Sequence, residues 1–155
     1  MKTFLNLLEK VINISSQVFI SGIILLTFYS IVLRYVFKSP PAWCMEFTRI
    51  MFLWLVMLGA AVVAREKGHI SINFFVDRFP PALKTAWQVL LHLMILAFCG
   101  LMIHQGLKIY PLVAEAETPT LGLSMGWLYL SVPAGGLLMA VYYLENLAGL
   151  FRRGG

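Results

Sequence analysis

Residues 11–33 read VINISSQVFISGIILLTFYSIVL and include no residue that is charged at neutral pH. The hydrocarbon layer of a bilayer is about 30 Å thick, so a helix needs roughly 20 consecutive apolar residues to cross it. This stretch meets that length, and Arg34 follows it directly. The sequence therefore predicts a first transmembrane helix over about residues 11–34.

The rest of the chain has the same apolar character. Of its 155 residues, 60% are hydrophobic and only 12% are charged, and the mean hydropathy is +0.83. Soluble domains are about 25% charged, so this chain has too little charge to cover a water-facing surface. Three further stretches predict transmembrane helices over about residues 47–65, 85–108 and 121–146. The predicted fold class is an all-α membrane protein, with four transmembrane helices in one integral membrane domain of residues 1–155.

The segment between the second and third stretches is amphipathic. Residues 65–84 read REKGHISINFFVDRFPPALK, in which large apolar side chains alternate with polar ones. A short helix over about residues 69–79, lying in the plane of the membrane surface, would bury the apolar side chains and keep the charges in water. A solvated loop is the alternative, and it would leave the aromatic rings exposed. The residues expected to anchor this segment at the membrane surface are Arg65, Glu66, His69, Phe74, Phe75 and Phe79.

Basic residues are distributed unequally between the two sides of the predicted bundle. Eight lie on the side of the two termini, and four lie on the opposite side: Arg34, Lys38, Arg49 and Lys108. Lys and Arg accumulate in short cytoplasmic loops, so this distribution predicts that the N- and C-termini are both cytoplasmic. The net charge of +5 follows from such anchoring and requires no nucleic-acid partner.

The sequence shows no pattern typical of an enzyme. We find no hydrolytic triad, phosphate-binding glycine loop or paired carboxylates, and we predict no catalytic residue, cofactor or metal site. A b-haem-binding membrane anchor subunit of a respiratory enzyme is the alternative function, because such proteins ligate haem through histidines. His92 and His104 would lie about 18 Å apart along one helix, too far to hold one iron. We interpret both as packing or interhelical hydrogen-bonding residues.

The first connector, residues 33–49, reads LRYVFKSPPAWCMEFTR. Its two prolines predict a tight turn between two membrane helices, with Trp43 at the membrane surface. Arg49 lies about one turn inside an apolar helix, where a cation needs a partner, so we expect Glu46 to pair with Arg49 or with Arg34. The alternative is that these residues act only as helix-end charges, Arg34 by snorkelling and Glu46 by complementing the helix dipole.

Small residues recur in two of the predicted helices. Gly122 and Gly126 form a G-x-x-x-G pattern at the start of the fourth, and Gly59-Ala60-Ala61 lies in the second. Such residues let helix backbones approach closely, so both patterns predict tight packing.

The order of these motifs resembles the small membrane subunit of tripartite ATP-independent periplasmic (TRAP) transporters. The resemblance covers RYVFKSPPAWCMEFTR, FLWLVMLGAAVVAREKGHISINFF and FPP, about half of the chain, and the four-helix layout covers all of it. The family often has two acidic residues where this chain has Met45-Glu46, and an aspartate where it has Asn73. The residues that carry the resemblance are Arg34, Pro40 or Pro41, Trp43, Glu46, Trp54, Gly59, Ala60, Arg65, His69 and Ile70, with a looser match at Trp127, Tyr129, Pro133 and Gly135.

The resemblance implies a small, non-catalytic scaffold subunit of a sodium-driven transporter in the bacterial inner membrane. Its substrates would be organic acids such as C4-dicarboxylates or sialic acid. Its partners would be a large elevator-type membrane subunit, a periplasmic substrate-binding protein and membrane lipids. The residues expected at the subunit interface or docking surface are Arg34, Trp43, Glu46 and Arg49.

Overall fold

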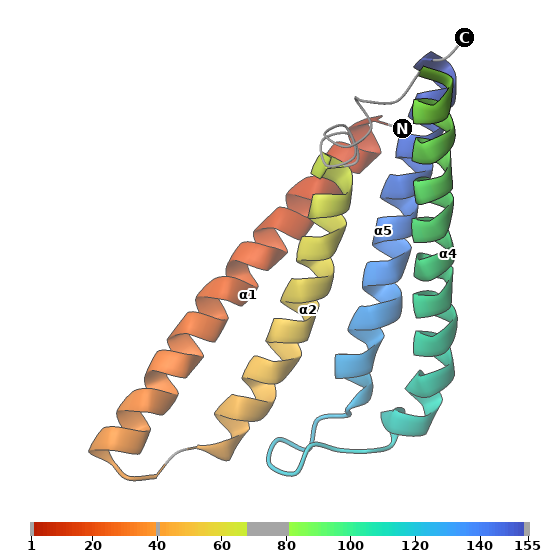
Figure 1. Cartoon of the computed structure of the whole chain (residues 1–155). Helices are drawn as coiled ribbons and strands as arrows, with labels where there is room; N and C mark the ends of the chain where they lie inside the picture. The colour runs from red at the N-terminus through yellow and green to blue at the C-terminus, as the bar shows by residue number, and fades with distance from the viewer. Residues whose placement is uncertain (1, 40, 68–80, 154–155) are drawn as a thin grey trace.

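In the computed structural model the described part of the chain folds into four long α-helices (Figure 1). They are α1 (Lys2–Val36), α2 (Ala42–Lys67), α4 (Pro81–Ala114) and α5 (Gly126–Arg153). The structure describes residues 2–39, 41–67 and 81–153. Each helix contains a span that is long and apolar enough to cross a membrane. The predicted all-α architecture with four transmembrane helices is confirmed, whereas the predicted interfacial segment of residues 69–79 lies outside the described residues.

The helices lie side by side in the spatial order α1, α2, α5, α4 (Figure 1). The closely packed pairs are α1 with α2, α2 with α5, and α5 with α4. The N- and C-termini lie together at one end of the bundle, which we call the terminal end. The α1–α2 turn and the connection between α4 and α5 lie at the opposite end, which we call the loop end.

The core lies in the terminal half of the bundle. Its buried members are Ile12 of α1, Leu58 and Ala61 of α2, and Tyr142 of α5. Ala61 is completely buried, which agrees with the close packing predicted from Gly59-Ala60-Ala61. In lipid, helices are held together by dispersion contacts and not by exclusion of water, so close approach of their backbones is favourable. The small side chain of Ala61 lets α2 approach its neighbours in this way.

Helix α5 is central in the row and contacts both neighbours through glycines. A Cβ atom added at Gly135 would lie 2.7 Å from Cβ of Met57 in α2. A Cβ added at Gly106 of α4 would lie 2.7 Å from Cδ of Pro133 in α5. Both distances are shorter than carbon–carbon contact allows, so the two helix pairs fit only because these positions lack a side chain.

The fourth helix begins later than the sequence predicted. We expected a span from about residue 121, but α5 begins at Gly126. Gly122 has a φ of +62° and lies in a turn before the helix, a left-handed conformation that favours glycine. The two glycines therefore do not share a helix face, because Gly122 shapes a turn. Gly126 does pack tightly as predicted, since an added Cβ there would lie 3.1 Å from Cε2 of Tyr110 in α4.

Candidate functional site

The α1–α2 turn at the loop end is tight, as predicted. The backbone N–H groups of Phe37 and Ser39 both donate to the carbonyl of Leu33, at 3.1 and 3.4 Å. Between them Lys38 has a φ of 54°, the left-handed conformation that commonly ends a helix. Arg34 is therefore fixed in the last turn of α1, and Cys44 lies buried in the first turn of α2.

The connection between α4 and α5, residues 115–125, folds back on itself like a small hairpin. The N–H of Thr118 donates to the carbonyl of Leu123 at 2.8 Å, and the N–H of Met125 donates to the carbonyl of Ala116 at 2.8 Å. The hydroxyl of Ser124 donates to the carbonyl of Ala114 at 2.6 Å and accepts from the N–H of Gly126 at 3.1 Å. One side chain thus links the end of α4 to the start of α5.

Glu46 connects this hairpin to α2. Its carboxylate accepts hydrogen bonds from the N–H of Thr120, at 3.1 and 3.3 Å, and from the N–H of Leu121, at 3.1 Å. Hydrogen bonds to an ionised acceptor are stronger than those between neutral groups. We conclude that Glu46 holds the tip of the hairpin against the first turns of α2.

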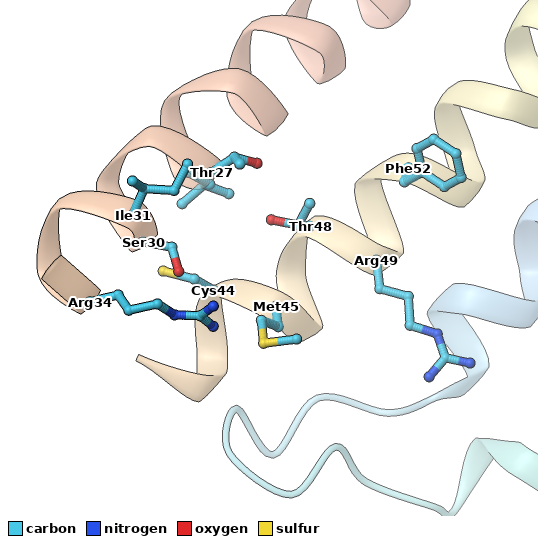
Figure 2. A pocket seen from close by; sticks show the side chains of 10 residues that line it. Thr27, Ser30, Ile31, Arg34, Cys44, Met45, Thr48, Arg49 and Phe52 are labelled. Atoms are coloured by element: carbon cyan, nitrogen blue, oxygen red, sulfur yellow. The ribbon is translucent and has the colours of Figure 1, made fainter. Parts of the chain in front are cut away.

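The ion pair that we expected between Glu46 and Arg34 or Arg49 is not formed within the part of the chain that the structure describes. The prediction was wrong because backbone N–H groups of the hairpin, far away in the sequence, occupy the carboxylate. The side chain of Arg49 points away from α1 and toward the connection between α4 and α5 (Figure 2). There it borders a cavity of about 310 Å³, which also includes Thr118 and Tyr129 in its walls.

Two tryptophans of α2 take different positions near the loop end. Trp43 is 36% exposed, and its ring lies against that of Tyr29 in α1, with 6.2 Å between the ring centroids. Trp54 donates its Nε1–H to the carbonyl of Trp127 in α5 at 3.0 Å. Trp43 is thus available at the surface, whereas Trp54 links two helices.

At the terminal end, Arg65 joins three helices. It forms an ion pair with Glu9 of α1, and its guanidinium lies 5.8 Å from the ring centroid of Tyr142 in α5. The side chain of Asn146 adds a hydrogen bond from its Nδ2 to the carbonyl of Ala64, at 3.3 Å. The other residues expected to anchor this end, Glu66, His69, Phe74, Phe75 and Phe79, have side chains outside the described part of the chain.

The sequence did not predict the partners of Glu46 at the loop end or of Arg65 at the terminal end. Glu9 lies at the same end of the predicted bundle as the basic residues around Arg65 and is the only acidic residue of the first helix, and this was the available signal for the ion pair. Thr120 and Leu121 gave no signal, because their contribution comes from backbone N–H groups.

His92 is buried between α4 and α5, 2% exposed. Its Nδ1 lies 2.7 Å from the carbonyl oxygen of Gln88, and since a carbonyl can only accept, we assign the hydrogen to Nδ1. The ring packs edge-on against Tyr143, with 5.7 Å between the ring centroids. His104, by contrast, is exposed. The contact with Tyr143 agrees with the interpretation of His92 as a packing residue, whereas its hydrogen bond to Gln88 stays within α4 and is not interhelical.

The chain is similar to one family of proteins over most of its length. The family described as "Tripartite ATP-independent periplasmic transporters, DctQ component" matches residues 23–153. The sialic acid TRAP transporter small permease protein SiaQ of Vibrio cholerae is 26% identical over 152 residues, which cover 96% of this chain and 88% of that protein. The C4-dicarboxylate TRAP transporter small permease protein DctQ of Rhodobacter capsulatus is 31% identical over 115 residues, which cover 72% of this chain and 50% of that protein.

A longer protein contains a similar region. The sialic acid TRAP transporter permease protein SiaT of Haemophilus influenzae is 24% identical over 151 residues, which are 97% of this chain but only 24% of that protein. The region that resembles this chain is therefore a minor part of a larger permease protein.

Proposed function

Because the chain belongs to the DctQ component family of tripartite ATP-independent periplasmic (TRAP) transporters, we propose that it is a small, non-catalytic scaffold subunit for sodium-driven uptake of organic acids. The match over residues 23–153 is the observation that carries this proposal, and it favours transport over the haem-anchor alternative. Relatives named for sialic acid and for C4-dicarboxylates support carboxylates as the substrate class.

The proposed partner is a large, elevator-type membrane subunit. SiaT supports this partner, because a region similar to this chain is joined there to a much longer permease chain. The open row of helices also suits a scaffold: the candidate span in α1, Leu7–Val36, contains an apolar window none of whose residues is buried. Large side chains such as Leu25 and Phe28 are exposed there, available to lipid or to another subunit.

The proposed docking surface for the other subunits is the loop end, where Arg34, Trp43, Glu46 and Arg49 all lie. Trp43 and Arg49 are exposed and can contact a partner directly. Glu46 would act indirectly, because its carboxylate already holds the hairpin. An aromatic residue and an arginine are the residue types enriched at energetically important interface positions.

The proposed orientation puts both termini in the cytoplasm of a bacterial cell and the loop end in the periplasm. The hairpin and the α1–α2 turn would then face the periplasmic substrate-binding protein. At the cytoplasmic side, Arg65 and the segment that follows it would anchor the chain at the inner membrane surface, where basic residues meet anionic lipid.

Assembly tests this proposal. The full chain, carrying an affinity tag, is coexpressed with the large TRAP membrane subunit, extracted in mild detergent and examined by size-exclusion chromatography with native mass spectrometry. We expect one complex of fixed stoichiometry without a Soret absorption band. Joint replacement Trp43→Ala and Arg49→Gln should reduce recovery of the large subunit, whereas Lys10→Gln at the terminal end should not.

Two results would overturn the proposal. One is elution of the wild-type chain apart from the large subunit, when both proteins are present in the extract. The other is a Soret band that copurifies with this chain in stoichiometric amount, which would restore the haem-anchor alternative.

A further inference from the structure

A cleft of about 420 Å³ lies between α1 and α2 in the loop half of the bundle (Figure 2). Its wall on α1 includes Leu26 and Ile31, and its wall on α2 includes Phe52. The hydroxyl-bearing side chains of Ser30 and Thr48 line it as well. The cleft is therefore mainly apolar, with a few polar groups.

The geometry of the two helices explains why the cleft opens toward the loop end. Next to it, Gly22 of α1 lies so close to Met51 of α2 that an added Cβ would be 2.5 Å from Met51 Cε. From this contact the two helices diverge until the turn joins them (Figure 1). The cleft is therefore wedge-shaped and widens toward the loop end. Both of its helices contain apolar membrane spans, so we expect the cleft to open to the bilayer.

Arg34 lies at the wide end of the wedge. Its side chain extends from α1 toward the first turn of α2, near Cys44 (Figure 2). Arg49 also lines the cleft, but its side chain extends toward the connection between α4 and α5 (Figure 2). Within the described part of the chain no carboxylate forms an ion pair with Arg34: Glu46 is occupied by the hairpin, and the ion pair of Arg65 lies at the terminal end. Arg34 is exposed at the border of the hydrocarbon layer, where an anionic partner would stabilise a cation, and no carboxylate among the described residues supplies one.

We propose that the cleft binds one glycerophospholipid, with its phosphodiester on the guanidinium of Arg34 and one acyl chain along Leu26 and Phe52. Arginine suits a phosphodiester, because its planar group can donate two parallel hydrogen bonds to phosphate oxygens. Water is a poor filler for the inner part of the cleft, since each buried water needs two to four polar partners. A flexible hydrocarbon chain can follow the wedge and restore the dispersion contacts that an empty gap would lose.

The size of the cleft favours a lipid over a helix of another subunit. A helix with its side chains is about 10–12 Å wide and rises about 5.4 Å per turn, so the whole cleft would hold roughly one turn. A transmembrane helix could therefore pass over the cleft but not enter it. The site does not depend on the proposed transport function, and it leaves Trp43, which does not line the cleft, for contacts with proteins.

The test measures lipid binding by the full chain in detergent. Palmitoyl-oleoyl phosphatidylglycerol is titrated onto delipidated protein, and native mass spectrometry counts the bound lipids. We expect one lipid that binds more tightly than all later ones. Arg34→Gln should weaken this first binding step at least tenfold, about 1.4 kcal/mol, whereas Lys108→Gln, which removes an exposed cation of α4 outside the cleft, should leave it unchanged.

A second variant tests the apolar part of the site. Leu26→Trp fills the inner cleft while Arg34 remains, and it should also weaken the first binding step. Palmitoyl-oleoyl glycerol, which has the same acyl chains without phosphate, should bind weakly, and glycerol 3-phosphate, which has the phosphate without chains, should not compete. Helicity and monodispersity of each variant confirm that it is folded.

Three outcomes would overturn the proposal. Equal first-step binding by the wild type and Arg34→Gln would show that Arg34 is not the phosphate ligand. Full competition by glycerol 3-phosphate would indicate a site for free anions. Loss of the tightly bound lipid when the large membrane subunit is coexpressed, together with release of that subunit by Arg34→Gln, would show that a protein occupies the cleft.

Discussion

Replacement of Gly106 by alanine tests the packing of α4 on α5. The added Cβ would lie 2.7, 3.1 and 3.2 Å from Cδ, Cγ and Cβ of Pro133. Favourable carbon–carbon contacts are about 3.5–4.0 Å, so the closest of these is short by about 0.8 Å. A proline ring cannot rotate away as a flexible side chain can. The clash can be relieved only if α4 and α5 move apart.

The expected loss of unfolding free energy is defined by comparison with a matched control variant on the same helix. An added methylene in a packed core typically costs about 1–3 kcal/mol. Glycine to alanine also gains about 1 kcal/mol of helix propensity, which would partly mask this cost. Gly100→Ala gains the same propensity, and nothing lies within 4 Å of its added Cβ. The difference in unfolding free energy between the two variants should therefore be about 1–3 kcal/mol, with Gly106→Ala the less stable.

Unfolding in mixed micelles measures this difference. The purified full chain is titrated from dodecyl maltoside into dodecyl sulfate, and near-ultraviolet circular dichroism reports the loss of fixed aromatic packing. The transition of Gly106→Ala should occur at a lower dodecyl sulfate fraction than that of Gly100→Ala. Equal midpoints, or a more stable Gly106→Ala, would refute the close approach of α4 and α5 at this position.

Two further substitutions test the polar contacts. Glu46→Gln removes the negative charge that accepts hydrogen bonds from the hairpin, so amide hydrogen exchange in residues 115–125 should accelerate. Replacement of the exposed Glu115 by glutamine is the control. Unchanged exchange in the Glu46 variant would contradict the contact. Arg65→Gln breaks the ion pair with Glu9 and should lower the unfolding free energy by about 1 kcal/mol, as expected for a partly exposed pair with an aromatic contact. Lys10→Gln should have little effect, and a loss as large as that of Arg65→Gln would argue that the total positive charge at this end, and not the Arg65–Glu9 pair, determines the stability.

The membrane helices could be predicted from the sequence because each depends on a long run of local apolarity. Their ends could be predicted only in part. Helix α2 begins at Ala42, directly after Pro41, and not at residue 47 as predicted. The polar residues that precede the apolar run are helical as well and form the end of α2 that we expect at the membrane surface. The start of α5 was missed because an apolar run continues through Leu121 and Leu123, whereas the backbone there follows the turn of Gly122.

The sequence predicted which end of the bundle holds the candidate residues but not how they contact one another, and their role in docking stays a prediction. The sequence singled out Arg34, Trp43, Glu46 and Arg49, and all four lie at the loop end. It could not show that Glu46 turns toward the hairpin, because the contact joins residues 74 and 75 positions apart and its donors are backbone groups. Local charge patterns predict neighbours along one helix, whereas this contact depends on how α2 packs against α5.

Uptake by reconstituted vesicles is the most direct test that this chain is a required subunit of the transporter. Proteoliposomes contain the large membrane subunit with or without this chain, and the binding protein, an inward sodium gradient and a labelled carboxylate such as sialic acid or succinate are supplied outside. If this chain is the scaffold subunit, uptake should require it, the large subunit, the binding protein and the gradient together. Equal uptake by vesicles that lack this chain, or uptake by vesicles that contain this chain alone, would contradict a scaffold role.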